Sequence, residues 1–274
     1  MKIPFTKAHG ARNDFLLTWR GELHKCDARD YDFPTVARAI CDRHTGIGAD
    51  GWLLVKQDSD ADARIDLFNS DGSTSPISGN GTRCAAAFLI EAGHASEHLR
   101  IATGAGVKHL DLLQRDGRRL VFEMNMGPAR IDELHASMLG RDAVILDVGN
   151  PQCAVFVEHF DFDWHSVGAA IERDARFPYR TNVSFLKVLD RHTLDLRFFE
   201  RGAGVTMSSG TGSTGAAAAA AARGLVDHNV QVQTPAGPLH LRWRGEDILL
   251  AGPAEIIGSG EFYLDQAGHD WEVK

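Results

Sequence analysis

The sequence has no long apolar run, no excess of basic residues and no apolar leader, and each absence excludes a class of protein. No run approaches the roughly 18 consecutive apolar residues of a membrane-spanning helix. The net charge of −8 and the pI of about 5.9 argue against nucleic acid or an anionic membrane as a partner. Because the first fifteen residues contain no apolar signal region, we expect a cytoplasmic protein.

Metal-binding and disulfide patterns are also missing. The 4 cysteines, at positions 26, 41, 84 and 153, are scattered and form no CxxC pair. The 13 histidines include no HExxH motif. The sequence therefore predicts neither a disulfide scaffold nor a zinc site.

What is present describes an ordinary soluble globular protein. Hydrophobic residues make up 43% of the chain and charged residues 24%, which is enough apolar material for a large core. A length of 274 residues suggests two domains, at roughly 150 residues each.

One segment occurs twice. In both copies a phenylalanine is followed ten residues later by Ser-Gly-x-Gly and then by a run of alanines, first at Phe68 and Ser78 and again at Phe199 and Ser209. The copies are 131 residues apart, about half of the chain. Repetition at half-length predicts two similar domains related by a pseudo-twofold axis.

Each copy also predicts the start of a helix. Serine is a preferred N-cap, and the second copy continues into seven alanines, Ala216–Ala222. A helix of alanines has no polar face, so we expect it to be buried on every side. Its N-terminus carries free N–H groups and the positive end of the helix dipole, and two such ends facing one cleft would bind an anion.

The remaining pattern predicts an α+β fold of two pseudo-symmetric domains, each a mostly antiparallel sheet wrapped around a central buried helix. We expect an N-terminal domain of residues 1–119, to which a last strand of residues 260–274 returns, and a C-terminal domain of residues 120–259. Strands are expected at 2–19 (two, turning at 9–13), 52–56, 64–68, 145–149, 182–189 and 193–199, helices at about 34–41 and 164–173, and turns at 116–117, 235–238 and 244–247.

The glycines of the second copy allow a different interpretation. Gly210–Gly215 matches GxGxxG at the start of a helix, as in dinucleotide-binding domains. Such a site also needs an apolar strand directly before the first glycine and an acidic residue about 20 positions later. Residues 205–209 are a poor core strand and residues 230–234 contain no acid, which disfavours a nucleotide cofactor.

Polar residues gather around the two helix starts. Glu200 and Arg201 precede the second one, and asparagines stand at strand-to-turn junctions that we place at corresponding stages of the two halves. Amides, a carboxylate and a guanidinium facing two helix N-termini suit a small ligand with carboxylate and ammonium groups. The asparagines are Asn13, Asn69, Asn150 and Asn182.

Several motifs together resemble the diaminopimelate epimerase family, in that family's order and over essentially the whole chain. The resemblance implies a cofactor-independent and metal-independent isomerase of amino-acid and lysine biosynthesis, which interconverts LL- and meso-diaminopimelate. It also implies two cysteines at the helix N-termini that remove and return the α-proton on opposite faces. The motifs are Asp42–Gly51, Ser78–Cys84, Gly149–Pro151, Thr181–Val183 and Glu200–Gly212.

The resemblance also implies roles for individual residues. Backbone groups of the helix starts would hold the α-carboxylate, Asn69, Asn182 and Arg201 the distal carboxylate, and Asn13, Asn150 and Glu200 the rest of the amino acid. The backbone groups are those of Gly79, Asn80, Gly210 and Thr211.

The chain departs from the family at the two bases, where Ser78 and Ser209 replace cysteine. A thiol with a pKa of about 8.5 ionises readily at a helix N-terminus, whereas a serine needs an activating neighbour or serves only as an N-cap. Cys84 and Cys153 are not expected to be bases. Other departures are Arg12 for the family's Gly, Gln152 for its frequent His and Val205 for its Glu. Gly51 stands where some members have a glutamine that binds substrate.

Three functions stay open. In the first, the chain is an epimerase in which Ser78 and Ser209 transfer the proton. In the second, it is a relative that binds an amino acid and catalyses another isomerisation, an elimination or no reaction. In the third, it is an epimerase in which both cysteines were exchanged for serine to trap the substrate. The expected partner is an amino-acid substrate, and the chain could form a homodimer.

Overall fold

The computed structural model describes residues 2–23 and 32–264. The chain divides into two compact units: unit 1 consists of Met1–His9, Asp14–Val107 and Glu255–Lys274, and unit 2 of Gly10–Asn13 and Lys108–Ala254. Cys26 and the part of the predicted last strand beyond position 264 lie outside the described residues.

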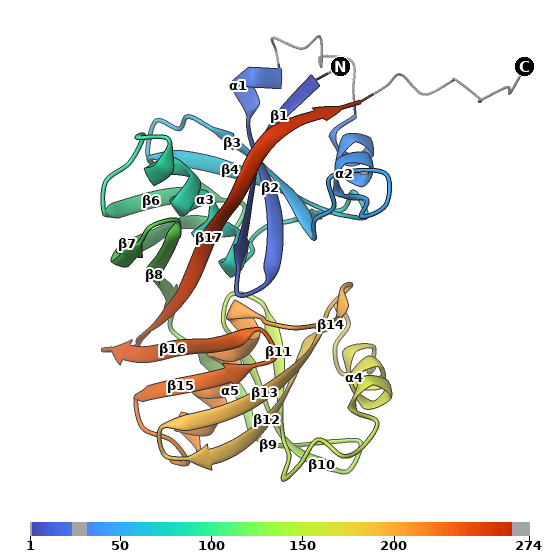
Figure 1. Cartoon of the computed structure of the whole chain (residues 1–274). Coiled ribbons are helices and arrows are strands. Elements are labelled where there is room, and N and C mark those ends of the chain that lie inside the picture. The colour runs from blue at the N-terminus through green and yellow to red at the C-terminus, as the bar shows by residue number, and fades with distance from the viewer. Residues whose placement is uncertain (1, 24–31, 265–274) are drawn as a thin grey trace, which may run out of the picture. The chain divides into compact units, whose positions relative to one another are not determined.

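Unit 1 alternates strands and helices. Strands β2 and β3 are parallel and joined through α2, β3 and β4 are antiparallel, and β4 and β6 are parallel and joined through α3. Figure 1 shows α2 beside these strands, and its buried face packs on β3 and β4. The elements are β1 (Lys2–Gly10), β2 (Asn13–Trp19), α1 (Arg20–Leu23), α2 (Phe33–Cys41), β3 (Gly51–Lys56), β4 (Ala63–Asn69), β5 (Thr74–Ser75), α3 (Gly79–Glu91), β6 (His98–Thr103) and the start of β7 (Gly106–Asp116).

Unit 2 repeats this order. Strands β11 and β12 are parallel and joined through α4, β12 and β13 are antiparallel, and β13 and β15 are parallel and joined through α5. The elements are β8 (Arg119–Gly127), β9 (Arg130–Met138), β10 (Arg141–Asp147), β11 (Pro151–Phe156), α4 (Trp164–Glu172), β12 (Asn182–Asp190), β13 (Thr193–Glu200), β14 (Gly204–Thr206), α5 (Gly210–Ala222), β15 (Asn229–Thr234), β16 (Gly237–Arg244) and the first part of β17 (Asp247–Tyr263).

The strand register shows which residues correspond between the two units. Gly51 pairs with Asn69 across β3 and β4, and the register of β12 and β13 brings Asn182 opposite Glu200 in the same way. Asn69 therefore corresponds to Glu200, and Asn182 to Gly51. The expectation that all four asparagines stand at corresponding stages was wrong for Asn69 and Asn182, because they lie on different strands of the repeat.

The register of the preceding strands gives the remaining pair. Phe15 lies opposite Gly51 on the parallel neighbour, and Gln152 lies opposite Asn182. Two residues earlier along the chain stand Asn13, the first residue of β2, and Asn150, the residue before β11. For these two asparagines the predicted correspondence is confirmed.

Helix α5 is the core of unit 2. It lies against β9, β10, β11, β12, β13, β15 and β16, and Ala216–Ala220 are no more than 5% exposed. Alanine allows strands to approach the helix axis closely on all sides, so the predicted burial is confirmed for these residues. The last turn differs: Ala222 is exposed, since the helix leaves the core before Arg223.

Strand β17 is longer than the sequence indicated. Its first residues pair with β16 in unit 2, and residues 255–263 pair antiparallel with β1 in unit 1. The predicted hairpins at 116–117, 235–238 and 244–247 are confirmed by the strands that flank them.

Candidate active site

Both repeated serines are helix N-caps. Ser78 and Ser209 have extended backbones, and each side-chain oxygen accepts a hydrogen bond from the backbone N–H three residues later, at 3.1 Å in both units. The hydroxyl hydrogen of each serine remains for a second partner. The first turn of each helix also carries N–H groups that have no carbonyl within the helix to bind.

The second glycine of the Ser-Gly-x-Gly cap in unit 2, Gly212, has a steric reason. A Cβ atom at Gly212 would lie 2.9 Å from the Ser184 hydroxyl and 3.0 Å from the Ser209 Cβ atom. Only glycine lets the first turn of α5 approach these residues while its N–H reaches the cap oxygen. The Ser-Gly-x-Gly pattern thus fixes where the Ser209 hydroxyl lies.

A carboxylate accepts a hydrogen bond from the Ser209 hydroxyl. The Ser209 Oγ atom donates a hydrogen bond to Glu200 Oε2 at 2.7 Å, and Thr206 Oγ1 donates to Glu200 Oε1 at 2.6 Å. The short β13–β14 hairpin, in which Glu200 pairs with Gly204, brings these side chains together. Burial raises the pKa of the Glu200 carboxyl, and the two hydroxyl donors oppose that shift.

Unit 1 has an amide where unit 2 has this carboxylate. The Nδ2 atom of Asn69, the counterpart of Glu200, donates to Ser73 Oγ at 2.9 Å. Among the described residues of unit 1, no carboxylate accepts a hydrogen bond from Ser78. The two serines therefore differ chemically although their backbone settings match: Ser209 has a proton acceptor and is 3% exposed, while Ser78 is half-buried.

Two other predicted residues of unit 2, Asn182 and Asn150, are held by hydrogen bonds. Asn182 is buried, its Oδ1 accepts from the Arg201 backbone N–H at 3.1 Å, and its Nδ2 donates to the Pro151 carbonyl at 3.1 Å. Asn150 Nδ2 lies 3.5 Å from Thr211 Oγ1 at the first turn of α5. These bonds hold the amides in place and leave each of them further donor and acceptor capacity.

Arg201 and Gln152 complete this region. The Arg201 side chain is exposed and donates to the Tyr179 carbonyl at 3.1 Å, on the outside of the loop that precedes β12. Gln152, 1% exposed, donates to Asn150 Oδ1 at 2.7 Å, a support that the sequence analysis did not predict. Nothing in the pattern Asn-Pro-Gln indicated this role before the register of β11 was known.

In unit 1, an ionic cluster fixes the backbone next to Asn13. Asp14 is 9% exposed, and its carboxylate binds both Arg43 at 2.8 Å and Lys7 at 3.1 Å. Arg43 also binds Asp50 at 2.8 Å, and the carboxylates of Asp14 and Asp50 each accept the other residue's backbone N–H. Sequence reasoning missed this cluster, although the charges of the motif Asp42–Gly51 were a signal.

Three cysteines are unsuited to proton transfer. Cys41, Cys84 and Cys153 are buried, and desolvation raises the pKa of each thiol to about 12. A neutral thiol is a poor base near pH 7. The expectation that Cys84 and Cys153 are not bases agrees with this burial.

Two further properties concern the whole described chain. Within residues 2–23 and 32–264, no group of three or more His, Cys, Asp or Glu side chains is placed to hold a metal ion. No helix in the same residues is long and apolar enough to cross a membrane.

Sequence comparison identifies the family. The family model described as diaminopimelate epimerase matches residues 5–131 and 144–257. The chain belongs to the diaminopimelate epimerase family. Proteins named diaminopimelate epimerase from Pelotomaculum thermopropionicum and Archaeoglobus fulgidus are 37% and 36% identical to it, over 94% and 98% of this chain and 98% and 100% of their own lengths.

Solved structures share the fold. A hydroxyproline epimerase from Agrobacterium vitis, with bound trans-4-hydroxy-L-proline, superposes with a TM-score of 0.76 at 17% identity over 95% of this chain and 90% of its own. A phenazine biosynthesis protein of the PhzF family from Bacillus anthracis gives 0.72 at 16% identity over 96% and 100%. The predicted family, its α+β fold and the class of isomerase are confirmed.

Proposed function

We propose that this chain of the diaminopimelate epimerase family binds diaminopimelate and transfers its α-proton through Ser78 and Ser209, with Glu200 as the final acceptor on the Ser209 side. The observation that carries the proposal is the 2.7 Å hydrogen bond from the Ser209 hydroxyl to Glu200, at the N-terminus of α5. The substrate is inferred from the names of the relatives, and the proton transfer is inferred from the residues of this chain.

A serine alone is too weak a base for this reaction. The hydrogen bond to Glu200 gives the Ser209 hydroxyl a carboxylate that can take its proton. The Ser209 Oγ atom takes the proton from the α-carbon while its own proton passes to Glu200 Oε2. One C–H bond and one O–H bond break, an O–H bond forms on each of Ser209 and Glu200, and the electron pair stays on the α-carbon. Because burial raises the Glu200 pKa, this carboxylate is a stronger base than an exposed one.

The helix starts would stabilise the charge that develops. The N–H groups of Gly210 and Thr211 begin α5, and those of Gly79 and Asn80 begin α3. Such groups at the positive end of a helix dipole favour a carboxylate and the enolate-like charge next to it. Asn13, Asn69, Asn150, Asn182 and Arg201 are proposed to bind the remaining amine and carboxylate groups of the substrate.

Inversion requires Ser78 to give a proton to the opposite face of the same carbon. Since no carboxylate among the described residues of unit 1 accepts a hydrogen bond from Ser78, this serine would regain its proton from water, which makes its step the slower one. A second candidate function follows from this difference: a protein that binds the amino acid and exchanges its α-proton on one face without inverting it.

The test is incubation of the protein with LL-diaminopimelate in D2O, following the α-proton signal by NMR. Loss of this signal, with formation of the meso isomer, supports the epimerase. Loss without the meso isomer supports one-face exchange. If the signal stays unchanged for hours at high protein concentration, the proposal is wrong, and tight binding in the same sample would identify a binding protein.

The double variant Ser78→Cys, Ser209→Cys is the matched positive control. If the binding residues are intact, thiols at these positions should raise the rate of epimerisation strongly. A double variant without activity would show that the substrate is a different amino acid.

A further inference from the structure

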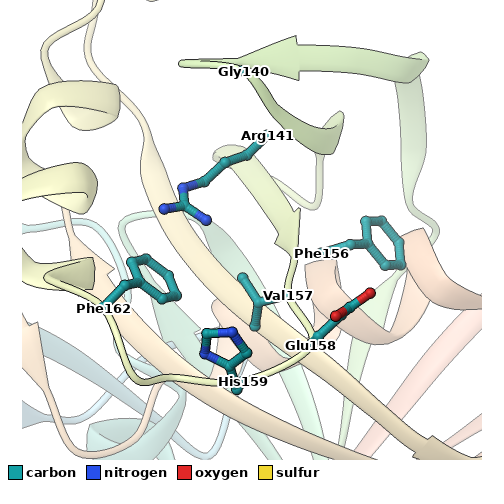
Figure 2. A pocket seen from close by; sticks show the side chains of 7 residues that line it. All are labelled: Gly140, Arg141, Phe156, Val157, Glu158, His159 and Phe162. Carbon is teal, nitrogen blue, oxygen red and sulfur yellow. The ribbon is translucent and has the colours of Figure 1, made fainter.

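A hollow of about 280 Å³ lies in unit 2 and contains none of the proposed active-site residues. It is formed where β10 begins and where β11 runs into the segment before α4. Figure 2 shows the Arg141 guanidinium, the Phe162 ring and the His159 ring around the same side of it, with Val157 behind them. A cation, an aromatic ring and an imidazole therefore face one open space of ligand size.

Arg141 is the cation, and its position is unusual for this chain. The guanidinium lies 4.0 Å above the ring centroid of Phe162. Among the described residues no carboxylate, carbonyl or hydroxyl forms a hydrogen bond or ion pair with the Arg141 side chain. One face is covered by the ring while the N–H groups at the edge are left for a partner from solution.

Two other arginines of unit 2 each form an ion pair with a carboxylate, which Arg141 lacks among the described residues. Arg197 lies 4.3 Å from the ring centroid of Phe160 and forms an ion pair with Asp195. Arg223 lies 4.4 Å from that of Phe156 and forms an ion pair with Asp142. All three arginines stack on a phenylalanine of the segment 156–162, and only Arg141 of these three has no carboxylate.

His159 adds a second donor. Its Nδ1 atom accepts the backbone N–H of Asp161 at 3.2 Å, so the neutral ring carries its proton on Nε2. Glu158 is the only acid that lines the described hollow, and Figure 2 shows its carboxylate directed toward Phe156, on the side away from Arg141. The Arg141 side of the hollow thus offers donors and apolar surface.

We propose that this hollow binds a small organic carboxylate with an apolar body. The carboxylate would take the fork of N–H groups of Arg141 and the Nε2–H of His159, and the body would lie on Phe162 and Val157. An arginine fork binds a carboxylate in two parallel hydrogen bonds, so a guanidinium that lies over a ring and has no carboxylate partner among the described residues suits this ligand.

The test is a titration of the ¹⁵N-labelled full chain with benzoate, followed by ¹H–¹⁵N NMR, with sodium sulfate at equal ionic strength as a parallel series. We expect benzoate to shift the amide signals of Gly140, Val157 and His159 together with the Arg141 Nε–H, with a Kd on the order of 1 mM. Arg141→Gln should weaken this binding about tenfold or more. Arg118→Gln removes the same charge from the exposed β7–β8 turn and should leave the Kd unchanged.

Each result decides for or against the site. Saturable shifts that Arg141→Gln abolishes and Arg118→Gln does not would support it. Equal shifts in the benzoate and sulfate series would overturn it, since they would report general screening of charge. Equal loss in both variants, or shifts confined to the helix starts, would also overturn it. The deuterium exchange test is independent, because neither variant alters the proposed active site.

Discussion

Glu200→Gln is the most informative change, because it keeps the shape of the side chain and removes the proposed proton acceptor. The two carboxylate oxygens accept hydrogen bonds from Thr206 at 2.6 Å and Ser209 at 2.7 Å. A glutamine has one oxygen, and its NH₂ group cannot accept a hydroxyl proton. One of the two hydroxyls therefore loses its acceptor, and among the described residues no carboxylate remains in hydrogen-bond contact with Ser209.

The size of the effect follows from this loss. A positioned general base contributes about 100- to 10,000-fold in rate, which equals about 3–5 kcal/mol of activation free energy. We expect deuterium exchange at the α-carbon to slow by that factor in Glu200→Gln. Glu246→Gln removes an acid from the exposed β16–β17 turn and should leave the rate unchanged.

The pH dependence gives a second readout. Burial raises the pKa of Glu200 above its ordinary value of 4.5, and only the ionised form can accept the proton. Exchange by the native chain should rise as the pH increases through this raised pKa and then level off, while Glu200→Gln stays low and lacks the rise. A variant with the native rate and the native pH profile would refute the role of Glu200.

The same shift links Glu200 to stability. A raised pKa in the folded state favours the protonated carboxyl, so this contribution to stability is complete below the ordinary pKa near 4.5 and is lost as the pH rises through the raised value. The free energy of unfolding of Glu200→Gln, measured in denaturant, should therefore increase relative to that of the native chain as the pH increases.

Three other changes have defined outcomes. Exchange of both Ser78 and Ser209 for cysteine should raise the rate of epimerisation, measured by NMR, because a thiol at a helix N-terminus ionises far more easily than a hydroxyl. Ala217→Leu should lower the free energy of unfolding by about 1–3 kcal/mol in urea, because this fully buried alanine leaves no room for a larger side chain. Asp14→Asn should cost about 1–2 kcal/mol at neutral pH. Burial alone would raise the Asp14 pKa, but Arg43 and a neighbouring lysine hold it below 3.8, so the native contribution is present above that value and is lost as the pH falls through the lowered pKa.

Local pattern was enough to predict most of the fold. The caps at Ser78 and Ser209, the buried face of α2 and the alanine helix each depend on residues close together in the sequence, where propensity and periodicity act. The repeat at half the chain length then predicted two related units. Long β17 was not predicted, because its two parts pair with strands from opposite ends of the chain.

The chemistry of the site was harder to predict, since it depends on register. Glu200 and Ser209 are nine residues apart, and only the β13–β14 hairpin brings their side chains into contact. The wrong correspondence of Asn69 with Asn182 has the same origin: the pairing of Gly51 with Asn69 is a property of the sheet, which the spacing of asparagines does not reveal. Residue types led to the proposal of which groups bind the ligand, and strand pairing decides the hydrogen-bond partners of those groups.

The difference between Asn69 and Glu200 has a stereochemical consequence. Both serines cap helices in the same way, but Ser209 also donates a hydrogen bond to Glu200, so we expect the two hydroxyls to differ in basicity. The α-hydrogen that faces Ser209 should exchange with solvent faster than the configuration inverts, whereas the hydrogen that faces Ser78 should exchange no faster than inversion. Comparing exchange and inversion for LL- and meso-diaminopimelate, the two isomers that the proposed reaction interconverts, measures this difference. Asn69→Glu would place a carboxylate at the corresponding position of unit 1 and should bring the two rates closer, and equal rates in the native chain would show that the Glu200–Ser209 hydrogen bond has no part in proton transfer.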